Sequence, residues 1–297
     1  MDVAECGEII QQKLTEFYDS RNAKGSENLL LQFLSRLPAW TDFCLTNTIL
    51  IFSQNSKASE LKMLEDWNEA GYTVIPGEKG VSLLFHRYKG REVEPYVKSH
   101  FGDNQIRREN SSRPPVRHDL PNGNGFRLNL YDFLKETFSM EVQYGKPENN
   151  ESFSVNHEKH IVTIPVMISD QDCFIRLIQA ASELEIDDLL QNQKIEKTQF
   201  EFCQFLFSFY LANLFQSKFR FFENQVCEIS EKLSLEGFTR CLFRTYCSLQ
   251  SLMVEWNRFR RNAVAPYPEK AQKPKIPISK KQNLTDRIKA AKRRTGG

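Results

Sequence analysis

Paired cysteines, glycine-rich loops and nucleophile motifs are missing from this 297-residue sequence. Its seven cysteines are scattered and form no C-x-x-C pair, so the sequence predicts neither a disulfide framework nor a zinc knuckle. The patterns G-x-x-x-x-G-K-[ST], G-x-G-x-x-G and G-x-S-x-G do not occur either. Phosphate-loop, dinucleotide-binding and serine-hydrolase chemistry therefore have no support in the sequence. We expect a protein without cofactor, metal or enzymatic activity.

Long hydrophobic runs are also absent. The longest uncharged apolar stretch, Phe202–Phe215, is shorter than the ~20 residues that cross a bilayer, and Gln204, Ser208 and Asn213 interrupt it. A buried core helix is the better interpretation. The first residues are acidic and alternate polar with apolar side chains, unlike a signal peptide. We therefore expect a cytoplasmic protein that does not enter a membrane.

Positive charge is concentrated near the end of the sequence. Residues 258–297 contain 13 Lys and Arg and 2 acidic residues, a net charge of +11, so the remaining 257 residues carry −9 of the chain's overall +2. A basic segment of this kind attracts polyanions, although such segments also serve partner docking or solubility.

Length and patterning predict an α+β protein in three parts, because 297 residues exceed the usual domain size of about 100–200. Residues 1–140 form a helical and hairpin domain with a flexible insertion near 98–124. Residues 141–259 form a mainly helical domain. Residues 260–297 form a basic, proline-rich linker with a short helix at about 285–294.

Apolar spacing of three to four residues predicts most of the helices. Two helices are expected before Pro38, and later ones at about 45–52, 60–70, 171–190, 199–216 and 235–259. Gly71 is expected to end its helix, and the two apolar runs on either side of Pro76–Gly80 are expected to form a hairpin. The segment FRLNLYDFL is expected to be a strand.

A family resemblance rests on the spacing of polar and aromatic residues between Leu30 and Tyr88. Trp40, Asn47 and Gln54 are followed by Trp67-Asn68-Glu69-Ala70-Gly71 and then by Gly77-Glu78-Lys79-Gly80 before an apolar run. This segment resembles the N-terminal single-stranded-DNA-binding domain of the ArdC-type antirestriction proteins. The resemblance implies a single-stranded-DNA-binding protein of a plasmid or conjugative element that protects incoming DNA.

Single strands are held by aromatic faces, by amide groups that reach base edges, and by cations or backbone N–H groups that reach phosphates. Asn47 and Gln54 are two helical turns apart and should share a face, and Lys79 lies in a glycine turn open to a phosphate. The candidate DNA-binding residues are Trp40, Asn47, Gln54, Lys62, Trp67, Gly77, Lys79, Gly80 and Arg87. Both tryptophans are interpreted first as core residues, whereas contact and plain surface roles stay equally open for Asn47, Gln54 and Lys79.

The resembled family commonly continues with a zinc-metallopeptidase-like domain that carries His-Glu-x-x-His on a helix. Here the corresponding helix has Gln179 and Glu183 at the ligand positions and Ala180 at the position of the general base. An amide is a poor zinc ligand, and alanine cannot move a proton. The sequence therefore predicts a degenerate, metal-free domain.

Two alternatives stay open. The Phe-rich second domain is a candidate for docking a protein partner, with the basic tail contacting nucleic acid. The other alternative is a metallopeptidase whose unusual ligands come from His157, His160, Glu183 and Glu201. His157 and His160 should point to different sides of a strand or turn, and Glu201 is more simply a solvated charge near a helix start.

Overall fold

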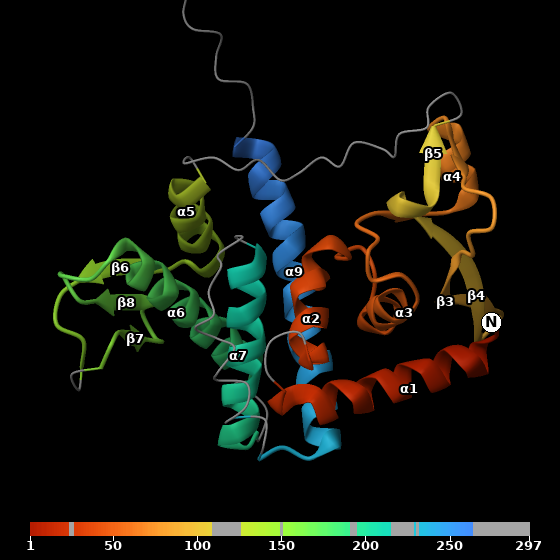
Figure 1. Ribbon diagram of the computed structural model, residues 1–297. Helices are drawn as coiled ribbons and strands as arrows, with labels where there is room; N and C mark the ends of the chain where they lie inside the picture. The colour runs from red at the N-terminus through yellow and green to blue at the C-terminus, as the bar shows by residue number, and fades with distance from the viewer. Residues whose placement is uncertain are drawn as a thin grey trace, which may run out of the picture. The chain divides into compact units, whose positions relative to one another are not determined.

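The computed structural model describes residues 1–23, 27–108, 126–148, 151–190, 195–214, 229 and 232–263. Helices alternate with short strands, so the fold class is α+β as expected (Figure 1). Residues Met1–Trp256 form one compact unit. The predicted domain boundary at 140/141 stays a prediction, and the predicted helix at 285–294 lies outside the described residues.

Eight α-helices lie in the described part of the chain, and the bounds of most of them follow the apolar periodicity. They are α1 (Val3–Asp19), α2 (Leu29–Arg36), α3 (Leu45–Asn55), α4 (Leu64–Glu69), α5 (Phe126–Phe138), α6 (Asp170–Leu190), α7 (Lys197–Leu214) and α9 (Leu235–Ala263). Gly71 follows α4 with a φ of 79°, as expected for a residue that ends a helix in the left-handed region.

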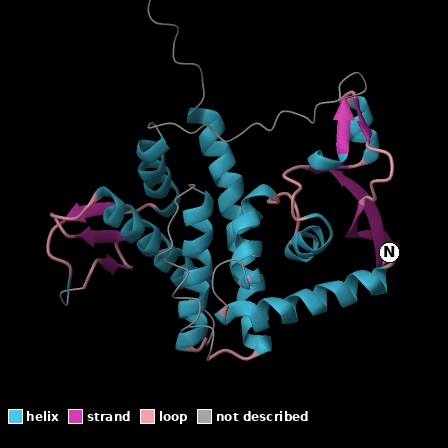
Figure 2. Cartoon of the chain, in the orientation of Figure 1, coloured by secondary structure: helices cyan, strands magenta, loops and turns pink. Residues whose placement is uncertain are grey.

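The strands form separate small sheets, and they gather in two places (Figure 2). In the first half, β1 (Leu61–Lys62), β4 (Glu92–Gly102) and β3 (Val81–Lys89) form one antiparallel sheet, and β2 (Tyr72–Val74) pairs with β5 (Ile106–Arg108). In the second half, β8 (Ile161–Ile164) lies between β6 (Glu141–Tyr144), which is parallel to it, and β7 (Ser154–Asn156), which is antiparallel.

The predicted hairpin around Pro76–Gly80 is wrong, because β2 and β3 do not pair with each other. β3 pairs with β4 through Val81↔His100 to Lys89↔Glu92, and β2 pairs with β5. The insertion predicted near 98–124 is therefore strand up to Gly102 and again at Ile106–Arg108. Residues 109–125 lie outside the described part of the chain.

The strand predicted for FRLNLYDFL is also wrong, because this segment begins helix α5. Its buried side chains Phe133, Leu134 and Phe138 recur at helical spacing, and the ring centroid of Phe133 lies 4.8 Å from that of Trp256 on α9. Packing against helices thus decides the conformation of a segment whose short alternation fits a strand.

Aromatic rings fill the interior of both halves. Phe17 of α1 stacks on Phe33 of α2 at 4.7 Å, and Phe52 of α3 meets both rings edge-on. The phenyl rings of α7 are buried as well, which confirms the expectation of a core helix over 202–215 as far as its described residues reach. No helix among the described residues is long and apolar enough to span a membrane.

Hydrogen bonds connect the first half to α9 and to the turn before it. The Tyr18 hydroxyl donates to the Leu233 carbonyl at 2.8 Å, and the Tyr246 hydroxyl donates to the Phe43 carbonyl at 2.6 Å. The Gln250 amide donates to the same Phe43 carbonyl at 2.7 Å. Phe43 directly precedes α3, so α9 fixes the segment from which α3 reaches the first sheet.

Candidate nucleic-acid interface

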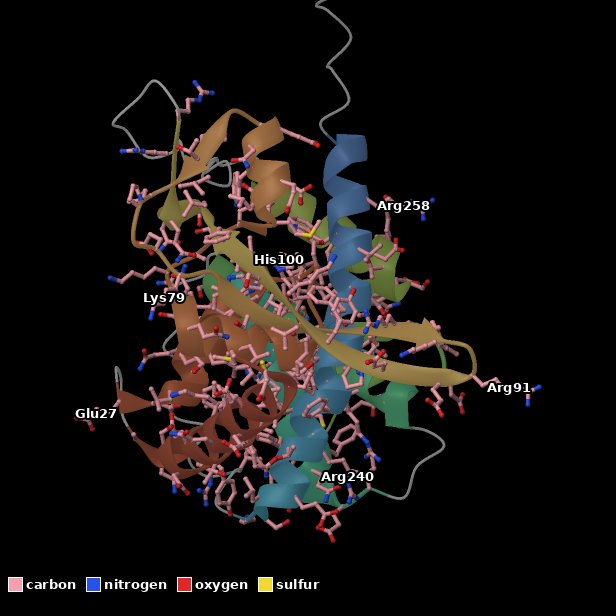
Figure 3. The ribbon with its side chains drawn as sticks, turned by 90° about the vertical axis from the view of Figure 1, so that its right-hand side faces the viewer. Glu27, Lys79, Arg91, His100, Arg240 and Arg258 are labelled. Atoms are coloured by element: carbon pink, nitrogen blue, oxygen red, sulfur yellow. The ribbon has the colours of Figure 1, made fainter. Side chains whose placement is uncertain are left out.

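The β3–β4 pair is a two-stranded ribbon whose inner half is buried and whose outer half is exposed. Val81, Ser82 and Leu83 are buried, whereas the side chains from His86 to Val93 all face solvent. Gly90 makes the turn with a φ of 69°, a conformation that glycine adopts without strain. Arg91 stands at this turn and points away from the ribbon (Figure 3).

One face of the ribbon carries aromatic rings together with cations. Odd-numbered residues of β3 and even-numbered residues of β4 share this face, because their cross-strand pairs include Phe85↔Tyr96. We call its members the Tyr96 cluster: Phe85, Arg87, Tyr96, Lys98 and His100. The ring centroid of Tyr96 lies 6.0 Å from that of Phe85, and the Arg87 guanidinium and Lys98 ammonium lie 5.6 and 6.0 Å from the Tyr96 ring centroid.

The two cations of the Tyr96 cluster differ in their partners. Arg87 pairs with Glu94 on the neighbouring strand, with N–O distances of 3.0 and 3.1 Å, so its charge is already partly compensated. The Lys98 ammonium lies 3.7 Å from the Met63 sulfur and makes no ion pair with any carboxylate that the structure describes. Lys98 is therefore the freer of the two to meet an incoming anion.

His100 forms the buried base of the cluster (Figure 3). Its side chain is 8% exposed, its ring stacks on Phe85 at 5.4 Å, and the Phe43 ring meets it edge-on at 6.0 Å. Burial lowers the pKa of His100 below its ordinary value of 6.5, the Lys98 charge lowers it further, and the Lys98 backbone and Asp66 oppose this. The Nδ1 atom is buried and has no hydrogen-bond partner among the described residues. Neutral His100 thus serves mainly as a stacking support.

Asn47 and Gln54 share a face of α3, as predicted, but that face is turned to β3. The Asn47 amide accepts from the Leu84 N–H at 2.8 Å and donates to the Leu84 carbonyl at 2.9 Å. The Gln54 amide likewise accepts from the Ser82 N–H at 2.9 Å and donates to the Ser82 carbonyl at 3.1 Å. We call these four bonds the amide clamp. The clamp occupies the backbone edge of β3 that faces away from β4. These amides therefore hold the strand and are not free to contact a base.

The other polar candidates lie in the turn before β3. Gly77 has a φ of 91°, and a Cβ atom on Gly80 would lie 3.2 Å from the His100 carbonyl, so both positions favour glycine for the shape of the turn. The Lys79 side chain is exposed, and its carbonyl accepts from the Gln105 amide at 2.8 Å. Of the predicted turn residues, Lys79 alone offers a charged group to a ligand.

Both tryptophans belong to the interior, which the sequence favoured. Trp40 is 1% exposed and donates its indole N–H to the Ala58 carbonyl at 2.9 Å. Trp67 is 3% exposed and donates to the Phe101 carbonyl at 2.8 Å. Lys62 lies over the Trp67 ring at 4.6 Å and pairs with Glu60 at 2.7 Å. The rings of Trp40 and Trp67 are therefore not available for stacking on bases.

The ligand set of the alternative metallopeptidase hypothesis is only partly brought together. His157 lies between two carboxylates of α6, with Nε2 3.1 Å from Glu183 and Nδ1 3.3 Å from Asp187. The two nitrogens lie on different edges of the imidazole ring. Glu183 and Asp187 therefore do not converge with one His157 nitrogen on a single metal position. Burial raises the pKa of Glu183, and His157 opposes this rise.

The remaining residues of that set point elsewhere. His160 contacts the Phe138 carbonyl through Nδ1 at 2.9 Å, Glu201 lies 3.8 Å from Lys197, and Gln179 accepts from Arg176 at 3.1 Å. Within the described ranges, no group of three or more His, Cys, Asp and Glu side chains is arranged to hold a metal ion. The Phe-rich helix α7 is buried, so a protein partner of this half would have to contact other residues.

Comparison with solved structures finds similarity to an antirestriction protein. No protein-family model and no curated protein matches the chain. A metal-free crystal structure of the antirestriction protein ArdC from plasmid R388 is similar with 13% identity and a TM-score of 0.43, over 74% of this chain and 86% of that chain. The Mn(II)-bound structure of the same protein gives 11% identity and a TM-score of 0.49, over 88% and 99%. Similarity at this level decides neither function nor site, which rest on the residues described above.

Sequence reasoning missed most of the Tyr96 cluster. Of its members only Arg87 was a candidate. Phe85 lies within the resembled segment as part of an apolar run, Tyr96 lies beyond the end of that segment near Tyr88, and Lys98 and His100 fall in the insertion predicted near 98–124. A usable signal was present, since Tyr96, Lys98 and His100 alternate at the two-residue period of a strand. It became visible only once the pairing of β4 with β3 was known.

Proposed function

We propose that this protein binds single-stranded DNA through the Tyr96 cluster of the β3–β4 ribbon. One observation carries the proposal: the half-buried rings of Tyr96 and Phe85 lie side by side on one face of the ribbon, with the cations of Arg87 and Lys98 within 6.0 Å of the Tyr96 ring. Bases stack on aromatic rings whatever their identity, and nearby cations neutralise the phosphates that connect them. This combination suits a strand bound without strict sequence preference.

The charges of the ribbon support the same proposal. Arg87, Lys89, Arg91 and Lys98 are exposed and face only two acidic residues of the ribbon, Glu92 and Glu94. A local positive field of this kind raises the rate of encounter with a polyanion, even though the body of the protein is acidic overall. The basic segment 260–297 adds a second, sequence-independent attraction to DNA.

A non-catalytic role is the better proposal for the second half. Ala180, which stands where the resembled family has its general base, is 0% exposed and cannot move a proton. The motif resemblance between Leu30 and Tyr88 adds the expectation of an antirestriction-like role on a plasmid or conjugative element, in the cytoplasm. Binding of single strands is the property that such a role would use.

Fluorescence polarisation with a labelled single strand tests the proposal. Loss of one stacking ring costs about 1–3 kcal/mol, so Tyr96→Ala should raise Kd by about 5- to 150-fold, while Tyr96→Phe should bind nearly as wild type. Tyr144→Ala is the matched control, since Tyr144 is an exposed tyrosine on β6 outside the ribbon. Unchanged binding by folded Tyr96→Ala would contradict the proposal.

A further inference from the structure

The second face of the ribbon carries no Lys, Arg, Asp or Glu side chain, whereas the first face is charged. Even-numbered residues of β3 and odd-numbered residues of β4 share it, through the pairs His86↔Pro95 and Tyr88↔Val93. Tyr88 is 84% exposed and Val93 is 53% exposed. We call these four residues the Tyr88 face.

Tyr88 and Val93 form an exposed cross-strand pair, and leaving their apolar surface in water is unfavourable. Contiguous exposed apolar surface of this kind is typical of a site that contacts a partner. Tyr88 and Val93 stand next to the turn that carries Lys89 and Arg91, so a partner of this face meets an apolar surface and positive charge together. The end of a DNA duplex has the matching chemistry, because its last base pair is a flat apolar surface bordered by phosphates.

The backbone edge of β3 connects the two faces. Successive N–H groups along a strand point to opposite edges, and the amide clamp shows that Ser82 and Leu84 point away from β4. His86 and Tyr88 follow at the same two-residue period, so their N–H groups face the same open edge. The clamp ends at Leu84, and in the described part of the chain no group accepts from these two N–H groups. The N–H groups of His86 and Tyr88 could therefore donate hydrogen bonds to DNA phosphates at this edge.

We propose that the ribbon recognises the junction between duplex and single-stranded DNA. The single strand lies on the Tyr96 cluster, and the Tyr88 face packs against the last base pair of the adjoining duplex. The proposal rests on the proposed function and makes its substrate more specific. A ribbon one strand layer thick, aromatic on both faces and positively charged at its turn, has the form of a wedge between a strand and the duplex that it leaves.

Binding to four labelled DNAs tests the junction: a single strand, a blunt duplex, and duplexes with a 5′ or a 3′ overhang of the same strand. The full chain should bind one overhang duplex about tenfold or more tighter than the single strand and the blunt duplex. Tyr88→Ala should remove this preference and leave the Kd for the single strand within about threefold of wild type. Tyr144→Ala should keep the preference, and all variants retain the basic segment.

A second readout separates stacking from a change in structure. With 2-aminopurine in the last base pair, wild-type protein should change its fluorescence on binding, and Tyr88→Ala should not. Tyr88 is so exposed that its loss should leave the urea unfolding midpoint unchanged. Single-strand binding without preference for either overhang would overturn the junction and leave the proposed function standing. Absence of binding to all four DNAs would overturn both.

Discussion

Replacing Asn47 by alanine tests whether this residue contacts DNA, as the sequence allowed, or holds strand β3 through the amide clamp. In the structure its amide makes two hydrogen bonds to the Leu84 backbone, at 2.8 and 2.9 Å, and the side chain is 3% exposed. The substitution leaves a backbone donor and a backbone acceptor without partners in a place that water reaches poorly. Each such group costs about 1–3 kcal/mol, so Asn47→Ala should lower the free energy of unfolding by about 2–6 kcal/mol.

Urea unfolding followed by tryptophan fluorescence measures this loss. With an m-value of about 3 kcal/mol per M, the midpoint should fall by about 0.7–2 M. Gln54→Ala removes the matching half of the amide clamp at a half-buried side chain, so its midpoint should fall by less. Under conditions where Asn47→Ala is folded, its Kd for single-stranded DNA should stay within about threefold of wild type. An unchanged midpoint together with a large loss of DNA affinity would refute the clamp and restore Asn47 as a DNA contact.

Two further predictions concern the Tyr96 cluster. Lys98→Gln should reduce the slope of log K for single-stranded DNA against log salt concentration by about 0.7, the value for one phosphate contact. Lys197→Gln on α7 is the control and should leave the slope unchanged. Equal slopes for Lys98→Gln and wild type would exclude a phosphate contact by Lys98. Burial holds the pKa of His100 below 6.5, so the unfolded chain binds more protons and the stability that this residue contributes is lost as pH falls below 6.5. His100→Phe keeps the stacked ring, so its unfolding midpoint should fall less between pH values of about 7.5 and 5 than that of wild type; parallel falls would contradict this assignment.

The helices could be predicted from the sequence because their signals are local. Apolar residues at three-to-four spacing placed α1, α2, α3, α6, α7 and α9 near their observed bounds, and Gly71 marked the end of α4. Segment 126–138 shows the limit of this signal. Its short alternation of apolar and polar residues fits a strand, but packing against α6 and α9 stabilises it as helix α5.

Strand pairing could not be predicted in the same way because it is not local. β4 contains Pro95 and several charged residues, a composition typical of a loop, and its strand conformation depends on nine cross-strand pairs with β3. The neighbouring apolar runs of β2 and β3 looked like the natural hairpin, yet each takes a partner from later in the chain. Since the Tyr96 cluster needs β4, the candidate site was hidden by the same error.

Periodicity predicts which side chains share a face, but it does not say what that face meets. Asn47 and Gln54 do share one, and their partner is the edge of β3. The residues that carry the family resemblance, including Trp40, Trp67 and Gly80, likewise shape or hold the framework of the ribbon. A framework of this kind fixes where an exposed ribbon stands and leaves its outer side chains free to differ. Preference for one DNA structure over another should therefore depend on the ribbon residues from Phe85 to Tyr96, whereas stability should depend on the motif residues beneath them.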